Sequence, residues 1–248
     1  MQQYFIEEIV EQQKQIHMNE EQSHHIAHVM RMREHEQIRI VDKDANIYLA
    51  SVHYEGRDVF ACLMESIVDT TKNPIRITLL QGMIKKEKWD FLLQKSAELG
   101  VDEIVPFISS RTVVKAKEER MDKKMQRYQK ILQEACEQCK RSTLVQLQEP
   151  MDMKKAAAYT SDLNLIAYED ADIQSDKLST LLKQNKGIQS VTIVIGSEGG
   201  FSKEEVSTFE ALGYKRVSLG SRILRAETAA IASIHALSFF YELEGENK

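Results

Sequence analysis

The chain has 248 residues, of which 42% are hydrophobic and 29% charged, a composition that excludes long disordered segments and leaves room for one large domain or two modest ones. Its acidic, mixed N-terminus lacks the basic region and apolar core of a signal peptide, and no apolar stretch reaches membrane length. Three cysteines cannot all pair within one chain, so we expect a reduced, cytoplasmic protein. The absence of a membrane-length stretch predicts that it has no membrane anchor.

Charge is distributed unevenly around the net value of −5. Residues 72–141 carry 16 Lys and Arg against 10 Asp and Glu, whereas the segments before and after them are acidic. A localised basic face on an acidic protein can bind a phosphate backbone, although a solvated lysine surface explains the same charges equally well.

Taken in chain order, the first seventy residues predict a small β-rich domain with one helix. EQSHHIAHVMRM, residues 21–32, is typical of a short helix. Residues 37–52 have β-branched residues on both sides of the turn-like DKDAN, which predicts a hairpin. We place the domain boundary after this region, at 1–72 and 73–248.

From residue 73 onward, strands and helices alternate, which predicts a mainly parallel sheet covered on both faces. The expected strands are 75–81, 103–108, 163–169, 191–196 and 216–220. The expected helices are 86–99, 118–139, one that begins after Ser202 and ends at Gly213, and a last one that runs through Phe240.

The glycine-rich turn GSEGGF, residues 196–201, lies between a buried strand and a helix. Ser202 and Glu205 have the spacing of a capping box, and Val206, Phe209 and Leu212 form the expected buried stripe of that helix. The turn matches neither GxGxxG nor the P-loop pattern, and Glu198 would repel a phosphate. Because glycines let a ligand approach the backbone closely, the turn favours a nucleoside with a positive centre.

A second loop, LGSRILRAET at residues 219–228, follows the next strand. Ligands of open α/β sheets bind beyond the carboxyl ends of the strands, where both loops would lie. Taken singly, each of its residues also has an ordinary structural interpretation, as core, surface or helix-start charge.

IGSEGGFSKEE and LGSRILRAETA together resemble the paired motif of the ribosomal RNA small-subunit methyltransferase E family. The resemblance extends to MQQYF and HHIAHVMRMR near the N-terminus, and to QKSAELGVDEIVPFISSRTVV and EACEQCKRS in the middle of the chain. It implies an α/β fold: a C-terminal SPOUT methyltransferase domain with a deep trefoil knot, preceded by a small β-rich PUA-like RNA-binding domain. Three places depart from the family pattern: Ser197, His35-Glu36 and Thr143-Leu144.

The resemblance implies S-adenosylmethionine as cofactor, 16S rRNA or the small ribosomal subunit as partner, and methylation of N3 of a uridine. The implied cofactor-binding residues are Tyr168, Glu169, Gly196, Glu198, Gly199, Gly200, Leu219, Gly220, Ile223 and Leu224. The implied RNA-binding residues are His24, Arg31, Arg33, Lys95, Arg111, Lys115 and Arg141. A non-catalytic RNA-binding or ribosome-assembly factor on the same fold is the alternative.

Methylation of N3 requires removal of its proton and stabilisation of the charge that develops on uracil. Glu198 and Glu227 are the candidate bases and Arg225 is the candidate cation. No metal is required, and neither the single CxxC at Cys136 and Cys139 nor the histidine pair His24 and His28 has the further ligands of a metal site.

The last helix is apolar around more than one face, which predicts either central burial or a shared interface. SPOUT enzymes usually pair through the knot region, so the resemblance favours a homodimer whose interface includes this helix, with Ile234 as an interface position.

Overall fold

The computed structural model describes residues 1–10, 14–111, 121–168 and 176–245. The chain divides into two compact units: the first contains Met1–Lys72 with Cys136–Thr143, and the second contains Asn73–Ala135 with Leu144–Lys248.

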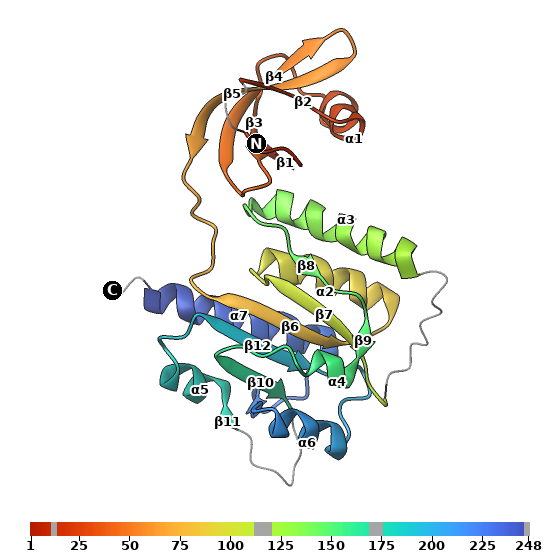
Figure 1. Cartoon of the computed structure of the whole chain (residues 1–248), viewed down its shortest axis with the longest axis vertical. Coiled ribbons are helices and arrows are strands. Elements are labelled where there is room, and N and C mark those ends of the chain that lie inside the picture. The colour runs from red at the N-terminus through yellow and green to blue at the C-terminus, as the bar shows by residue number, and fades with distance from the viewer. Residues whose placement is uncertain (11–13, 112–120, 169–175, 246–248) are drawn as a thin grey trace. The chain divides into compact units, whose positions relative to one another are not determined.

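The described part of Met1–Lys72 forms a five-stranded sheet and one helical segment (Figure 1). The strands are β1 (Gln2–Phe5), β2 (Gln15–His17), β3 (Gln37–Val41), β4 (Ile47–Glu55) and β5 (Asp58–Ile67), in the order β1-β3-β4-β5-β2. β1 pairs with β3 in parallel, and the other neighbours are antiparallel. The predicted hairpin is confirmed as β3 and β4, and its turn is held by Asp42, whose Oδ1 accepts the backbone N–H groups of Asp44 and Asn46.

The predicted helix of the first unit is confirmed as α1 (Glu20–His24), which continues as the π-helix η1 (His25–Val29). Asn19 and Gln22 form its capping box. After the helix, His35 adopts φ 66°, in the left-handed region that favours glycine. The His35-Glu36 departure therefore retains a turn geometry for which a glycine would be the usual choice.

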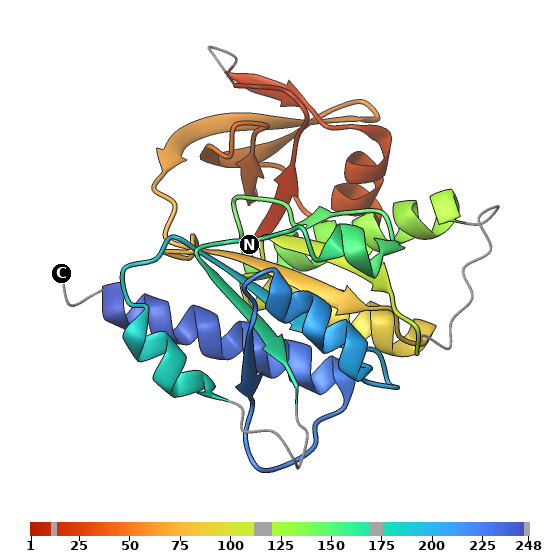
Figure 2. The same cartoon turned by 60° about the horizontal axis from the view of Figure 1, so that its bottom comes forward.

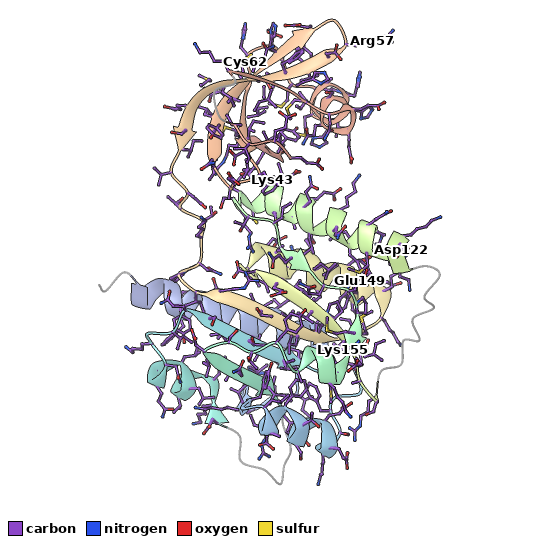
Figure 3. All side chains as sticks on the ribbon, viewed as in Figure 1. Lys43, Arg57, Cys62, Asp122, Glu149 and Lys155 are labelled. Atoms are coloured by element: carbon purple, nitrogen blue, oxygen red, sulfur yellow. The ribbon has the colours of Figure 1, made fainter. Side chains whose placement is uncertain are left out.

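The core of the first unit lies between its sheet and helix, and contains Tyr4, Ile16, Met18, Ile26, Ile38, Ile40, Ala50, Val52, Val59 and Ala61. Arg57 lies in the turn between β4 and β5, and Cys62 lies in β5 (Figure 3). Burial raises the pKa of the Cys62 thiol, as expected of a packing cysteine. Gln3 Nε2 donates to the backbone oxygen of Arg141 at 2.6 Å, which ties residues 136–143 to this unit.

An eight-stranded sheet forms the centre of the second unit, and every pairing in it is parallel. Its strands are β6 (Arg76–Gly82), β7 (Glu103–Ile108), β8 (Gln146–Leu147), β9 (Met151–Asp152), β10 (Leu163–Ala167), β11 (Asp176–Lys177), β12 (Ser190–Ile195) and β13 (Lys215–Ser218). The order is β11-β13-β10-β12-β6-β7-β8, with β9 also on β7. The predicted parallel sheet is confirmed.

Helices cover both faces of this sheet (Figures 1 and 2). The helices after residue 73 are α2 (Lys86–Glu98), α3 (Met121–Cys139), α4 (Met153–Ala156), α5 (Leu178–Gln184), α6 (Lys203–Ala211) and α7 (Ala226–Gly245); the last residues of α3, from Cys136, belong to the first unit. α7 packs against α2, β6 and β12 on one face. On the other face, α4 and α6 enclose an aromatic core with Phe107, Phe201, Phe209 and Tyr214.

Local signals set the boundaries of several elements in this unit. Gly100, at φ 94°, follows the end of α2, and the predicted capping box of Ser202 and Glu205 is confirmed at the start of α6. The predicted stripe of α6 is correct for Val206 and Phe209 but wrong for Leu212. Leu212 is the residue that ends the helix, so it turns away from the buried face and is exposed.

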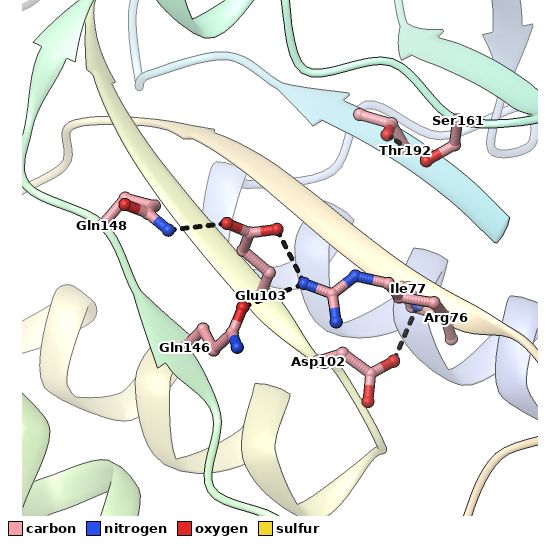
Figure 4. Close-up of polar contacts among 8 residues, drawn as sticks. All are labelled: Arg76, Ile77, Asp102, Glu103, Gln146, Gln148, Ser161 and Thr192. Atoms are coloured by element: carbon pink, nitrogen blue, oxygen red, sulfur yellow. Dashed lines mark hydrogen bonds and ion pairs between the residues drawn. The ribbon is translucent and has the colours of Figure 1, made fainter.

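The amino end of the sheet is closed by side-chain hydrogen bonds (Figure 4). Arg76 Nη2 donates to Glu103 Oε2 and to Gln146 Oε1, both at 3.0 Å. Glu103 Oε1 accepts from Gln148 Nε2 at 2.7 Å. These contacts join the first residues of three neighbouring strands, so this end is held together by polar side chains that satisfy one another.

Candidate active site

A cavity of about 570 Å³ lies at the carboxyl end of the second unit's sheet. Because β12 and β13 both pair in parallel with β10, the segments that follow these three strands meet at one edge. The cavity is lined by Lys88, Arg111, Ala167, Tyr168, Ile195, Gly196, Ser197, Glu198, Gly200, Phe201, Val217, Leu219, Arg222, Ile223, Leu224, Arg225, Ala226 and Ala229. The two loops expected to bind the ligand therefore lie together.

The Gly196–Gly200 turn follows β12 and is held close to the end of β6. A Cβ on Gly82 would lie 2.5 Å from the backbone nitrogen of Ser197, so only glycine permits this approach. Gln81 Nε2 donates to the Gly196 oxygen at 3.2 Å, and the turn closes through the Gly200 N–H to the Ser197 oxygen at 2.9 Å. Gly200 has φ 65°, and no atom lies near the position of a Cβ there.

Gly199 does not line the cavity, in contrast to its neighbours on both sides. A Cβ on Gly199 would lie 2.9 Å from the backbone oxygen of Arg111. Arg111 Nη1 also donates to the Gly199 oxygen at 3.3 Å. Gly199 therefore allows the turn to pack on the segment after β7, and its contribution to ligand binding is through the position of the turn.

The second loop contributes Leu219 and Arg222–Ala226 to the cavity. Ile223 is 93% exposed, although it lines the cavity, so it lies at the rim with most of its side chain in solvent. Gly220, at φ 123°, lines a different cavity of about 770 Å³ beside α5 and α7. Leu219 lines both cavities, whereas Ile223 lines only the first, so the loop runs between the two.

Lys88, in the first turn of α2, lies beside both candidate bases. Lys88 Nζ lies 3.6 Å from Glu198 Oε1 and 3.5 Å from Glu227 Oε2. Glu198 and Arg225 line the cavity, and Glu227 does not. The two candidate bases therefore lie beside the same lysine, but only Glu198 has direct access to the cavity.

The expected cofactor-binding and RNA-binding residues lie partly at the cavity and partly elsewhere on the chain. Tyr168 lines the cavity, and Glu169 and Lys115 lie outside the described residues. His24, Arg31 and Arg33 are exposed on the first unit. Lys95 Nζ pairs with Glu98 on α2 at 2.8 Å, and Arg111 lines the cavity itself. Arg141 is 7% exposed.

Sequence reasoning missed Lys88 as part of this site and assigned Arg111 only to RNA. Lys88 lies in the first turn of α2, which follows β6, and β6 is the neighbour of β12 in the sheet. The segment after β6 must therefore reach the same edge as the glycine-rich turn. The order of the strands would have identified Lys88, but that order is known only from the folded sheet.

Among residues 1–10, 14–111, 121–168 and 176–245, no group of three or more His, Cys, Asp or Glu side chains could hold a metal ion. In the same part of the chain, no helix is long and apolar enough to cross a membrane.

Comparison with known proteins identifies relatives over the full length of the chain. Residues 71–238 match the family described as RNA methyltransferase domain, and residues 19–58 match the family described as RNA methyltransferase PUA domain. The ribosomal RNA small subunit methyltransferase E of Bacillus subtilis is 31% identical, with 98% of each chain covered.

Two solved structures are similar in fold and contain the cofactor. The ribosomal RNA small subunit methyltransferase E of Neisseria gonorrhoeae, bound to S-adenosylmethionine, has a TM-score of 0.88 at 28% identity, with 97% of this chain and 98% of that chain covered. A Legionella pneumophila structure with bound cofactor SAM has a TM-score of 0.85 at 31% identity, with 95% and 96% covered.

Proposed function

The chain belongs to the ribosomal RNA small subunit methyltransferase E family, and from this membership we propose that it transfers a methyl group from S-adenosylmethionine to N3 of a uridine in 16S rRNA. The observation that carries the proposal is the cavity formed by the two loops at the carboxyl end of the sheet. The substrate implies that the enzyme acts in the cytoplasm, where ribosomes are assembled.

The cavity fits S-adenosylmethionine in size and chemistry. Its volume, about 570 Å³, lies within the range of small-molecule sites. Apolar side chains from the second loop and backbone groups of the glycine-rich turn suit an adenosine, and Gly200, which has no side chain, leaves the backbone open to the cavity. Glu198 adds a negative charge that favours a sulfonium over a phosphate.

The bound cofactor supplies an activated methyl group, and the chain supplies position and charge. The residues for this role line one cavity: Glu198 as a proton acceptor for N3–H, and Arg225 as a cation for the charge that develops on the uracil oxygens. Glu227 was an equal candidate for the base, but it does not line the cavity, and its Oε2 lies 3.5 Å from Lys88 Nζ.

RNA is held, in this proposal, by the PUA-like unit and by residues beside the cavity. His24, Arg31 and Arg33 are exposed and can contact RNA directly. Arg141 is buried and its backbone oxygen accepts a hydrogen bond from Gln3, so its contribution would be to the structure of the first unit. Arg111 would act at the cavity itself.

We further propose the trefoil knot expected of the SPOUT class. The strand order supports it: β12 lies on one side of β10 and β13 on the other, and the chain then returns to α7, which packs on β12 and β6. An experimental trace of residues 160–230 through density would decide whether the chain passes through a loop.

A homodimer is the last part of the proposal, and α7 supports it. Its inner face is buried in this chain, and Ala232, Ala236, Phe239 and Phe240 line an apolar cavity on another face. Phe239 is 54% exposed. The choice of Ile234 as an interface position was wrong, because Ile234 is fully buried against the chain's own core.

Paired substitutions on α7 test the homodimer. Phe239→Glu should yield a folded monomer with reduced activity, whereas Ile234→Glu should destabilise the fold, since it buries a charge. Light scattering gives the mass, and a fully active wild-type monomer would refute the dimer.

The function is tested by mapping methylated uridines in 16S rRNA from cells with and without the gene. We expect one N3-methyluridine to be lost without it and restored by the wild-type chain, but not by Arg225→Ala. An unchanged map would favour the RNA-binding or assembly factor instead.

A further inference from the structure

Lys88 lies between Glu198 and Glu227, the two candidate bases. Its ammonium nitrogen lies 3.6 Å from one carboxylate oxygen and 3.5 Å from the other, and its side chain is one-third exposed and lines the cavity. Two carboxylates around one ammonium leave an excess negative charge, and an ammonium has three N–H donors. Lys88 can therefore serve both glutamates and still donate to a ligand.

Glu227 approaches Lys88 from the side of α7 and away from the cavity. Its side chain is 12% exposed, and its Oε2 is buried with no hydrogen-bond partner among the described residues. A buried carboxylate oxygen without a hydrogen bond is costly, and the Lys88 ammonium at 3.5 Å is the charge that compensates it. This arrangement suits an anchor for Lys88 better than a proton acceptor.

Glu198 approaches Lys88 from the glycine-rich turn. Its Oε1 also accepts the backbone N–H of Lys85, the N-cap residue of α2, at 3.2 Å. Glu198 thereby connects the turn to the start of the helix that carries Lys88, and negative charge is favourable there. The three side chains come from separate segments, so their meeting fixes Lys88 relative to both loops of the cavity.

We infer that Lys88 is a ligand-contacting residue of this site, which donates to an oxygen acceptor of the bound reactants, and that Glu227 is a positioning residue that holds Lys88. The inference rests on the proposed function. The acceptor has the chemistry of a carboxylate or polarised carbonyl oxygen, which the amino-acid part of the cofactor and the uracil ring both offer. The two sources predict different losses.

Lys88→Met tests the inference, with Lys86→Met as the matched control, because Lys86 is exposed in the same helical turn and does not line the cavity. We expect a loss of about ten- to hundredfold, as for a removed hydrogen bond to a charged group. Weaker S-adenosylmethionine binding in calorimetry, with kcat retained at saturation, assigns the acceptor to the cofactor. A lower kcat at unchanged cofactor affinity assigns it to uracil.

Glu227→Gln tests the positioning role. In the wild-type background, it should reduce the same parameter as Lys88→Met, and in the Lys88→Met background it should reduce that parameter no further. Lys88→Arg should recover part of the loss, since it restores the charge but not the shape. Equal effects of Glu227→Gln in both backgrounds would overturn the positioning role.

Folding and function failures are separated by the remaining measurements. If Lys88→Met unfolds, because the two glutamates then repel each other, Lys88→Met with Glu227→Gln removes that repulsion and is assayed in its place. An inactive wild-type chain would refute the proposed function. An active wild-type chain with Lys88→Met indistinguishable from Lys86→Met, in both binding and turnover, would overturn the inference alone.

Discussion

The two ends of the large sheet use similar side chains in different ways. At the amino end, Arg76, Glu103 and Gln148 are joined by hydrogen bonds of 2.7–3.0 Å. At the carboxyl end, Lys88 lies 3.5–3.6 Å from two glutamates, and the adjoining turn is rich in glycine. The amino end satisfies its polar groups internally, whereas the carboxyl end leaves donors and acceptors available to a ligand. The same fold thus separates stability from function along its strands.

The largest expected effect is on turnover at the carboxyl end. Arg225→Ala should reduce kcat by about 10²-fold or more while cofactor affinity changes little, because the lost interaction is with charge that develops during methyl transfer. Single-turnover kinetics and calorimetry measure the two quantities. Equal losses of kcat and of cofactor affinity would make Arg225 a cofactor-binding residue.

Glycine substitutions at opposite ends of β12 give the next effect. Gly199→Val should weaken S-adenosylmethionine binding about tenfold or more, since its Cβ would meet the Arg111 backbone and overpacking costs about 1–3 kcal/mol. Gly187→Val is the control at the amino end, where no atom lies near the added Cβ. Calorimetric titration checks both, and similar affinities for the two variants would contradict the assigned role of the turn.

At the amino end, the expected effect is on stability. Glu103→Ala should lower the free energy of unfolding by about 1–3 kcal/mol, because it leaves Arg76 and Gln148 without their shared partner. Glu149→Ala, at an exposed position nearby in sequence, should change it by less than about 0.5 kcal/mol. Urea unfolding gives the free energies. A change in kcat for folded Glu103→Ala would contradict the assignment of stability to the amino end and of function to the carboxyl end.

The smallest effect is a pH dependence at the same end. Hydrogen bonds from the Gln189 backbone, the Ser190 hydroxyl and the Ser190 backbone lower the pKa of Asp162 below its ordinary value of 3.8. A lowered pKa stabilises the fold above the ordinary pKa, and this stabilisation is lost as pH falls through the lowered one. The stability difference between wild type and Asp162→Asn should therefore shrink in acid. Urea midpoints measured along the pH range check it, and a constant difference would contradict the assignment.

Short-range patterns identified most of the regular elements. The capping box of Ser202 and Glu205 lies within one helical turn, and the hairpin around Asp42 depends on neighbours two to four residues away. Such contacts form between residues close in sequence, so they can be recognised in it. Short strands such as β8, β9 and β11, with two residues each, have no period of their own and were not predicted.

The candidate site was predictable in its loops but not in its contacts. The order of the strands brings Gly196, Leu219 and Tyr168 to one edge, as the alternating pattern implied. Gly199 and Gly220 belong to the same motifs, yet they face Arg111 and the second cavity respectively. The direction in which a turn residue faces depends on its backbone torsion angles and on the atoms packed against it. A sequence motif specifies neither of these.

The sequence by itself determined the alternation of strands and helices, the caps and glycines that bound them, and the two loops that identify the family. Only the tertiary structure decided which face of α7 is buried, and that Lys88, Glu198 and Glu227 meet, although 110 residues separate the first two positions and 139 separate the first and third. The reason is physical: element formation depends on interactions within a few residues, whereas these meetings require β6 to pair with β12 and α2 to pack on α7.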